Sequence, residues 1–165
     1  MVFKNYVTSF VRQWNFVRSE TLEILISLSD EQLLFQPTGT DKWQPLYYQF
    51  TCIARTQMVY AKAIKEGKMN FNWFESDEFP DKHEIKTKQG LKDLLNKADT
   101  MWSAAIVERR RDEDFQIAWP GFKQSLPNHI VSLISHERIH HGELISYLTL
   151  GGFVLPKNFK QNWAL

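Results

Sequence analysis

The chain contains a single cysteine, Cys52, among 165 residues, so it cannot form an internal disulfide. It also has almost no excess of charge of either sign, since 20 lysines and arginines stand against 19 acidic residues, a net charge of +1. Proteins that bind nucleic acid or acidic membranes usually concentrate positive charge on one surface. We therefore expect neither partner, and Cys52 is left as a free thiol whose role depends on its neighbours.

Long apolar runs are missing as well. Residues 1–16, MVFKNYVTSFVRQWNF, carry charged or polar side chains every few positions, which is typical of neither a signal peptide nor a membrane span. We expect a cytoplasmic protein. A length of 165 residues fits one domain over residues 1–165, and no linker or second domain is needed.

Aromatic residues, in contrast, are abundant, with six tryptophans, twelve phenylalanines and five tyrosines. Large rings of this kind fill a core, line a pocket or form an oligomer interface. The last segment, residues 153–165 (FVLPKNFKQNWAL), is too aromatic for a loose end. We expect it to pack on the rest of the chain or on a second subunit, and a homodimer is the expected assembly.

Hydrophobic periodicity predicts four long helices, because apolar residues recur every three or four positions. The segments with this spacing are residues 3–28, about 44–65, 88–111 and 126–150. Gly67 is expected to end the second helix and Ser125 to cap the fourth, which Gly151 and Gly152 would stop. With almost no strand pattern, the sequence predicts an all-α fold, a four-helix bundle.

The connections between these helices differ in length. Residues 68–85 (KMNFNWFESDEFPDKHEI) contain Pro80 and have no clear period, so we expect a long loop between the second and third helices. Loops of this length inside a compact domain are often functional. Residues 115–127 (FQIAWPGFKQSLP) are expected to form a turn-rich link.

The segment ISHERIHHGEL, residues 134–144, holds three of the five histidines. At about 100° per residue, His136 and His140 lie one turn apart on the same side of the fourth helix, where two imidazoles can hold one metal ion. Glu137 points roughly 80° away from their mean direction, and His141 points about 100° away from His140. We expect Glu137 to need a partner in apolar surroundings, and His141, like His129, to be structural or to support the site.

Read letter by letter, His136, Glu137 and His140 also spell HExxH, the zinc-peptidase motif. Such peptidases take a third ligand from further along the chain. The residues after His141 offer one acid, Glu143, which is too close in sequence for that role. A zinc peptidase is therefore a minor alternative, and a histidine on an apolar face can also be a hydrogen-bonded core residue.

A catalytic metal site needs a third protein ligand, which in a bundle comes from a facing helix. Cys52 lies in the polar sector of the second helix. Four further residues lie within about 60° of its direction: Tyr48, Gln49, Arg55 and Thr56. Thiolate and imidazole together suit zinc, so Cys52 is the preferred third ligand. Free cysteine is also often a small buried core residue, and Gln49 or His83 would then be the candidates.

Two segments of the sequence resemble the DinB-like (damage-inducible) superfamily, a group of four-helix bundles that includes the bacillithiol S-transferases. HERIHHGELISYLTLGG (136–152) is similar to the closing H-x-x-x-H-[RH]-G-Q run of that family, and WQPLYYQFTCIARTQ (43–57) is similar to its tryptophan-led second helix. The resemblance covers nearly the whole chain. It implies a four-helix bundle with a metal site in which His136 and His140 are ligands.

The sequence departs from the family at two positions. The family's other metal histidine lies on the second helix, eight or nine residues after the tryptophan, and counting from Trp43 reaches Thr51 or Cys52. Glu143 also stands where the family often has glutamine. Either Cys52 replaces the histidine or the metal site is degenerate.

The resemblance implies a thiol-dependent S-transferase, or a hydrolase, that acts on a small molecule. A divalent metal, zinc or nickel, would bind and deprotonate a low-molecular-weight thiol, which then attacks an electrophile between the second and fourth helices. Arg55 would position an anionic group. Candidates for an aromatic pocket wall are Trp43, Tyr48, Trp73, Trp119 and Tyr147. A bundle that has lost its third histidine would instead be a non-catalytic ligand-binding or stress-response protein.

Overall fold

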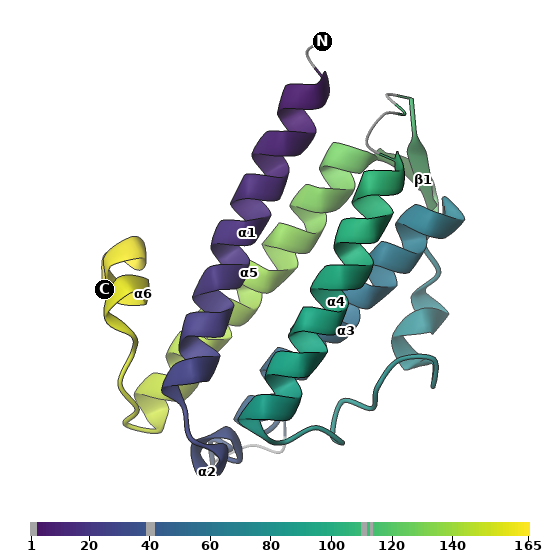
Figure 1. Cartoon of the computed structure of the whole chain (residues 1–165). Coiled ribbons are helices and arrows are strands. Elements are labelled where there is room, and N and C mark those ends of the chain that lie inside the picture. Colours follow the sequence, from purple (N-terminus) through teal and green to yellow (C-terminus); the bar gives the residue numbers. More distant parts are fainter. Residues whose placement is uncertain (1–2, 39–41, 110–111, 113) are drawn as a thin grey trace.

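Four long helices run alongside one another in the computed structural model, which describes the chain except for residues 1–2, 39–41, 110–111 and 113 (Figure 1). They are α1 (Phe3–Ser27), α3 (Leu46–Glu66), α4 (Lys88–Arg109) and α5 (Leu126–Leu150). The predicted all-α bundle, with its long connection between α3 and α4, is confirmed. None of the helices in the described ranges combines the length and apolar character needed to cross a membrane.

The helix ends follow local sequence signals. Gly67 ends α3 in the left-handed conformation, with a φ of 66°, and the Ser125 side chain accepts a hydrogen bond from the backbone N–H of Asn128 at the start of α5. The short helix α2 (Asp30–Leu33) begins with a capping box between Ser29 and Gln32. The predicted end of α4, residue 111, lies outside the described residues.

Helix α3 packs against both α4 and α5, and α5 packs in addition against α1. Most side chains of α3 are buried, and they include a set of polar ones: Gln49, Thr51, Arg55, Thr56 and Gln57. Buried polar groups need partners, because an unpaired one costs roughly 1–3 kcal/mol. Thr51 donates to the Tyr47 carbonyl of its own helix, and the partners of the other four side chains lie on the neighbouring helices and on the long loop.

A β-hairpin corrects the prediction of a simple link before α5. Strands β1 (Gln116–Trp119) and β2 (Phe122–Ser125) pair antiparallel, with Gly121 in the turn at a φ of 86°. The hairpin is attached to the end of α3, since the Ala118 N–H donates to the Gly67 carbonyl at 2.9 Å and the Met69 N–H donates to the Ala118 carbonyl at 2.7 Å. Strands of four residues are too short for a clear alternating pattern, which is why the sequence did not predict them.

The aromatic tail packs on the bundle, which is one of the two positions predicted for it; the other was a second subunit. Helix α6 (Lys157–Trp163) places Phe159 in a fully buried position, with its ring centroid 5.6 Å from that of His141 on α5. The Trp163 ring lies 5.9 Å from the same histidine. The tail therefore covers one side of α5.

Two glycines provide a matched test of the described backbone. Gly67→Ala should destabilise the protein by about 1 kcal/mol, because a left-handed φ is unfavourable for a residue with a Cβ. Gly142→Ala, inside α5, should stabilise it by about 0.5–1 kcal/mol, because apart from the adjoining residues and the backbone of the same helix no atom lies within 4 Å of the added Cβ. Urea unfolding of both variants measures the free energies. Equal effects of the two substitutions would contradict the backbone conformation given to Gly67.

Candidate metal site

His136 and His140 form the part of the site that α5 supplies. Their ring centroids are 4.6 Å apart, as expected for residues one helical turn apart on one face. His140 is buried and His136 is half-buried. The uninterrupted helix from Leu126 to Leu150 fixes this pair by its regular geometry alone.

Cys52 of α3 lies opposite the two histidines. The ligand atoms of Cys52, His136 and His140 all lie within 4.8 Å of one another. Among the described residues, these three form the cluster of histidine, cysteine or acidic side chains that could hold a metal ion. One thiolate and two imidazoles form a donor set that suits zinc and leaves a coordination position for another ligand. The structure thus brings together the three residues predicted as metal ligands.

The surroundings of His140 fit a ligand role. Its Nδ1 lies 2.6 Å from the Gln49 amide oxygen and 2.7 Å from a Glu143 carboxylate oxygen. Both oxygens are acceptors, so Nδ1 carries a proton and donates, and Nε2 is the nitrogen that would bind a metal ion after losing its own proton. Metal-binding histidines generally use one nitrogen for the metal and donate from the other in this way. Gln49 in turn donates to the Tyr147 hydroxyl at 3.4 Å, and Tyr147 donates to the Gln44 carbonyl.

His136 has fewer fixed contacts. Its Nε2 lies 3.4 Å from the hydroxyl oxygen of Thr56 on α3, and its buried Nδ1 has no hydrogen-bond partner among the described residues. A buried nitrogen without a partner is costly unless water or a metal ion satisfies it. The donor set and this nitrogen both fit a bound metal.

The pKa values of Cys52 and His140 shift in opposite directions and exchange their order. Burial of the Cys52 thiol raises its pKa, but hydrogen bonds with His136 and His140 outweigh burial and lower the pKa to about 6. Burial lowers the pKa of His140, but the Cys52 and Glu143 side chains outweigh it and raise the pKa to about 9. Between these two values a metal-free chain holds a thiolate beside an imidazolium.

Glu137 lies outside the metal cluster. Its carboxylate accepts a hydrogen bond from Thr21 and pairs with Arg18 at 3.3 Å, and both partners lie on α1. The prediction that Glu137 needs a partner is confirmed. The HExxH peptidase interpretation needs this carboxylate beside a metal-bound water, and the contacts with α1 hold it elsewhere.

The other two histidines of α5 are core residues with supporting contacts. His141 is fully buried, its Nε2 lies 2.8 Å from the Thr21 hydroxyl, and burial lowers its pKa to about 3. His129 is also fully buried, its Nε2 lies 3.1 Å from the Tyr60 carbonyl oxygen, and burial lowers its pKa to about 4. Both stay uncharged at neutral pH, as structural histidines do.

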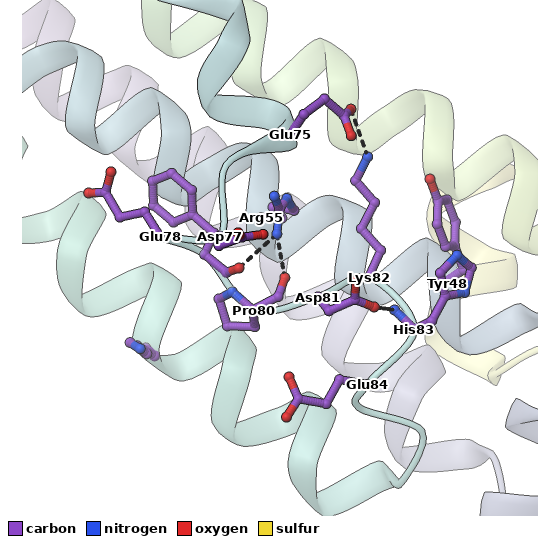
Figure 2. A pocket seen from close by; sticks show the side chains of 12 residues that line it. Tyr48, Arg55, Glu75, Asp77, Glu78, Pro80, Asp81, Lys82, His83 and Glu84 are labelled. Carbon is purple, nitrogen blue, oxygen red and sulfur yellow. Dashed lines mark hydrogen bonds and ion pairs between the residues drawn. The ribbon is translucent and has the colours of Figure 1, made fainter.

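A cavity of about 570 Å³ lies between α3 and the long loop, which includes the 3-10 helix η1 (Phe71–Glu75) (Figure 2). Tyr48 and Arg55 line it from α3, on the side of the helix that also carries Cys52. Its loop side carries five acidic residues: Glu75, Asp77, Glu78, Asp81 and Glu84. Polar side chains therefore dominate the wall of this cavity.

Arg55 has a different role from the predicted one. Its guanidinium donates to four backbone carbonyls of the long loop, those of Phe74, Ser76, Phe79 and Pro80. Figure 2 shows the side chain pointing into the loop, with two of these bonds drawn. The prediction that Arg55 holds an anionic substrate group is replaced by a structural role, because all three of its nitrogens donate to the loop.

His83 and most of the predicted aromatic wall lie apart from the cluster. The His83 ring lies 5.3 Å from the Tyr48 ring, and His83 Nδ1 lies 3.3 Å from the Tyr47 hydroxyl, so His83 belongs to the cavity wall. Trp119 packs on Tyr60 in the region of the hairpin. The Trp73 ring lies 4.7 Å from the Lys62 ammonium group, and the Trp43 ring packs on Tyr147 with the two centroids 5.1 Å apart.

A four-helix bundle with a Cys-His-His cluster between two of its helices defines a class of candidate metalloproteins. The family model described as the DinB superfamily matches residues 13–144. The chain therefore belongs to the DinB superfamily, in agreement with the resemblance found in the sequence. No curated protein matches it.

Two solved structures are similar in fold. A DinB-like protein from Bacillus cereus ATCC 10987 superposes with a TM-score of 0.70 at 17% identity, over 89% of this chain and 93% of that one. A DinB-like protein from Bacillus subtilis gives a TM-score of 0.65 at 20% identity, over 92% and 96% of the two chains. At these identities the similarity shows the fold alone.

The lowered pKa of the Cys52 thiol can be measured directly by alkylation, because Cys52 is the single cysteine of the sequence. In metal-free protein the iodoacetamide alkylation rate should rise with a midpoint near pH 6, since the thiolate is the reactive form. His140→Gln should move the midpoint upward, because it removes the imidazolium. His83→Ala is the control and should leave it unchanged. A midpoint near pH 9 in the unmodified sequence would contradict the described contacts.

Proposed function

We propose that this protein is a metal-dependent enzyme, a thiol S-transferase or a hydrolase that acts on a small molecule. The observation that supports the proposal most is the convergence of Cys52, His136 and His140 within 4.8 Å. Membership of the DinB superfamily supports it at the level of the family. Zinc is the preferred ion because one of the three donors is a thiolate, and nickel is the alternative.

Each residue of the site has a proposed task. Cys52, His136 and His140 hold the metal, while Gln49 and Glu143 fix the ring of His140 by accepting its Nδ1–H. When bound, a divalent metal supplies Lewis-acid chemistry, which lowers the pKa of a coordinated thiol or water.

The cavity beside α3 is the proposed place for the small-molecule substrate. Tyr48 provides a ring in its wall, and the carbonyl bonds of Arg55 keep the loop in position around it. The cavity lies on the side of α3 that also carries Cys52, but none of the three ligands lines it, so a substrate held there would have to extend along α3 to reach the metal. Half-burial of Cys52 and His136 is consistent with access from the outside.

Metal content tests the first part of the proposal. Protein purified without chelators or a polyhistidine tag should contain about one zinc ion per chain by elemental analysis. His136→Ala and His140→Ala should lose it, because two remaining donors hold zinc poorly. Cys52→Ser should reduce the zinc content strongly, and His83→Ala should not change it. Absence of stoichiometric metal in the unmodified protein would refute the metalloenzyme, and full retention in Cys52→Ser would remove the cysteine from the site.

Turnover tests the second part. The metal-loaded protein is mixed with low-molecular-weight thiols and an electrophilic probe such as monochlorobimane. The thioether should form faster, with release of chloride, than in the same mixture without protein. His140→Ala should lower the rate by a factor of about 100 or more, because the ligand set is broken. Arg12→Met, at an exposed position of α1 that does not line the cavity, is the control and should leave the rate unchanged. Binding of thiol or probe without any turnover would favour the non-catalytic ligand-binding alternative.

A further inference from the structure

One buried arginine connects all four long helices. Arg18 of α1 is only 4% exposed, and its Nη2 donates to the Gln57 amide oxygen of α3 and lies 3.3 Å from the Glu137 carboxylate of α5. Its Nε lies 3.1 Å from the Asp99 carboxylate of α4. Gln57 also donates to Asp99 at 2.8 Å, which links the partners to each other. These four residues are called the Arg18 cluster.

Stability alone does not explain such a cluster. Removing charged groups from water is costly, and apolar residues of similar size often give equal or greater stability in the same position. Glu137 is 1% exposed and Gln57 is fully buried, so this cost applies to the cluster. Ion pairs and hydrogen bonds are directional, whereas apolar contacts are not, so the cluster specifies how the helices are oriented.

The Arg18 cluster and the candidate metal site share two helices, α3 and α5. Glu137 follows His136 on α5, and its side chain points about 100° away from that of His136. On α3, Gln57 points about 140° away from Cys52. Gln57 also follows Thr56, whose hydroxyl oxygen lies 3.4 Å from His136 Nε2. On both helices, one face is held by the cluster while another face carries the metal ligands.

We propose that Arg18 is a positioning residue for the candidate metal site. By holding Glu137 and Gln57, it sets the rotation of α5 and α3 about their own axes. That rotation directs His136 and His140 toward Cys52. The inference rests on the proposed metal-binding function, and it adds a residue from α1, a helix other than the two that carry Cys52, His136 and His140.

Cobalt(II) binding tests the inference without any assay of activity. The thiolate-to-cobalt charge-transfer band reports on Cys52, and the intensity of the visible bands reports on the ligand geometry. The double variant Arg18→Met/Glu137→Gln removes both charges while it keeps an acceptor for Thr21, so it is designed to fold. We expect its cobalt affinity to fall about 10–100-fold, with a weaker charge-transfer band.

Two further variants make the test decisive. Arg12→Met removes an exposed arginine from the same helix and should leave the spectrum and affinity as they are. Arg18→Lys keeps the positive charge but lacks the planar fork that reaches three partners, so it should weaken binding in the same direction by a smaller factor. Circular dichroism confirms that each variant is folded, and Arg18→Lys decides the question if the double variant does not fold.

The outcomes separate the two proposals. Cobalt binding by the unmodified protein, with an unchanged affinity and spectrum in the folded Arg18 variants, would overturn the positioning role and leave the metal site intact. Failure of the unmodified protein to bind cobalt would overturn the proposed function, and the inference would fall with it.

Discussion

The packing of α5 between α1 and α3 is the contact on which the rest of the structure depends. Cys52 reaches His136 and His140 only because α3 and α5 lie side by side. Glu137 is buried only because α1 covers the neighbouring face of α5. A single helix thus serves two polar environments, and the 100° step between consecutive residues separates them.

The bundle buries many polar groups, and most of them are matched to a partner on another element. Gln49 pairs with His140 across α3 and α5, and His129 pairs with a carbonyl of α3. Arg55 connects α3 to the long loop through backbone carbonyls. Such pairs contribute modestly to the free energy of unfolding, but leaving one partner alone is costly. They therefore specify one arrangement of helices more than they increase its stability.

Helical periodicity was enough to predict the four long helices and the direction of His136 and His140, because both follow from local geometry. The prediction of Cys52 as the third ligand needed one further step, the search for a donor on a facing helix. The structure places its sulfur within 4.8 Å of the ligand nitrogens of both histidines. The role of Arg55 could not be predicted, because its partners are backbone carbonyls that have no sequence signature. The partner of Glu137 was missed for a related reason, since Arg18 lies more than a hundred residues away in the sequence.

Cys52 stands where the resemblance to the family implies a histidine, and this difference has an electrostatic consequence for a bound metal. A thiolate brings one negative charge where an imidazole brings none, so a divalent cation held by Cys52, His136 and His140 leaves the site one unit less positive. A less positive site acidifies a bound thiol less. The nearby Glu143 carboxylate acts in the same direction through its contact with His140. Tight binding of a soft metal and strong activation of a thiol are therefore opposing demands on this donor set, and the cysteine favours the first.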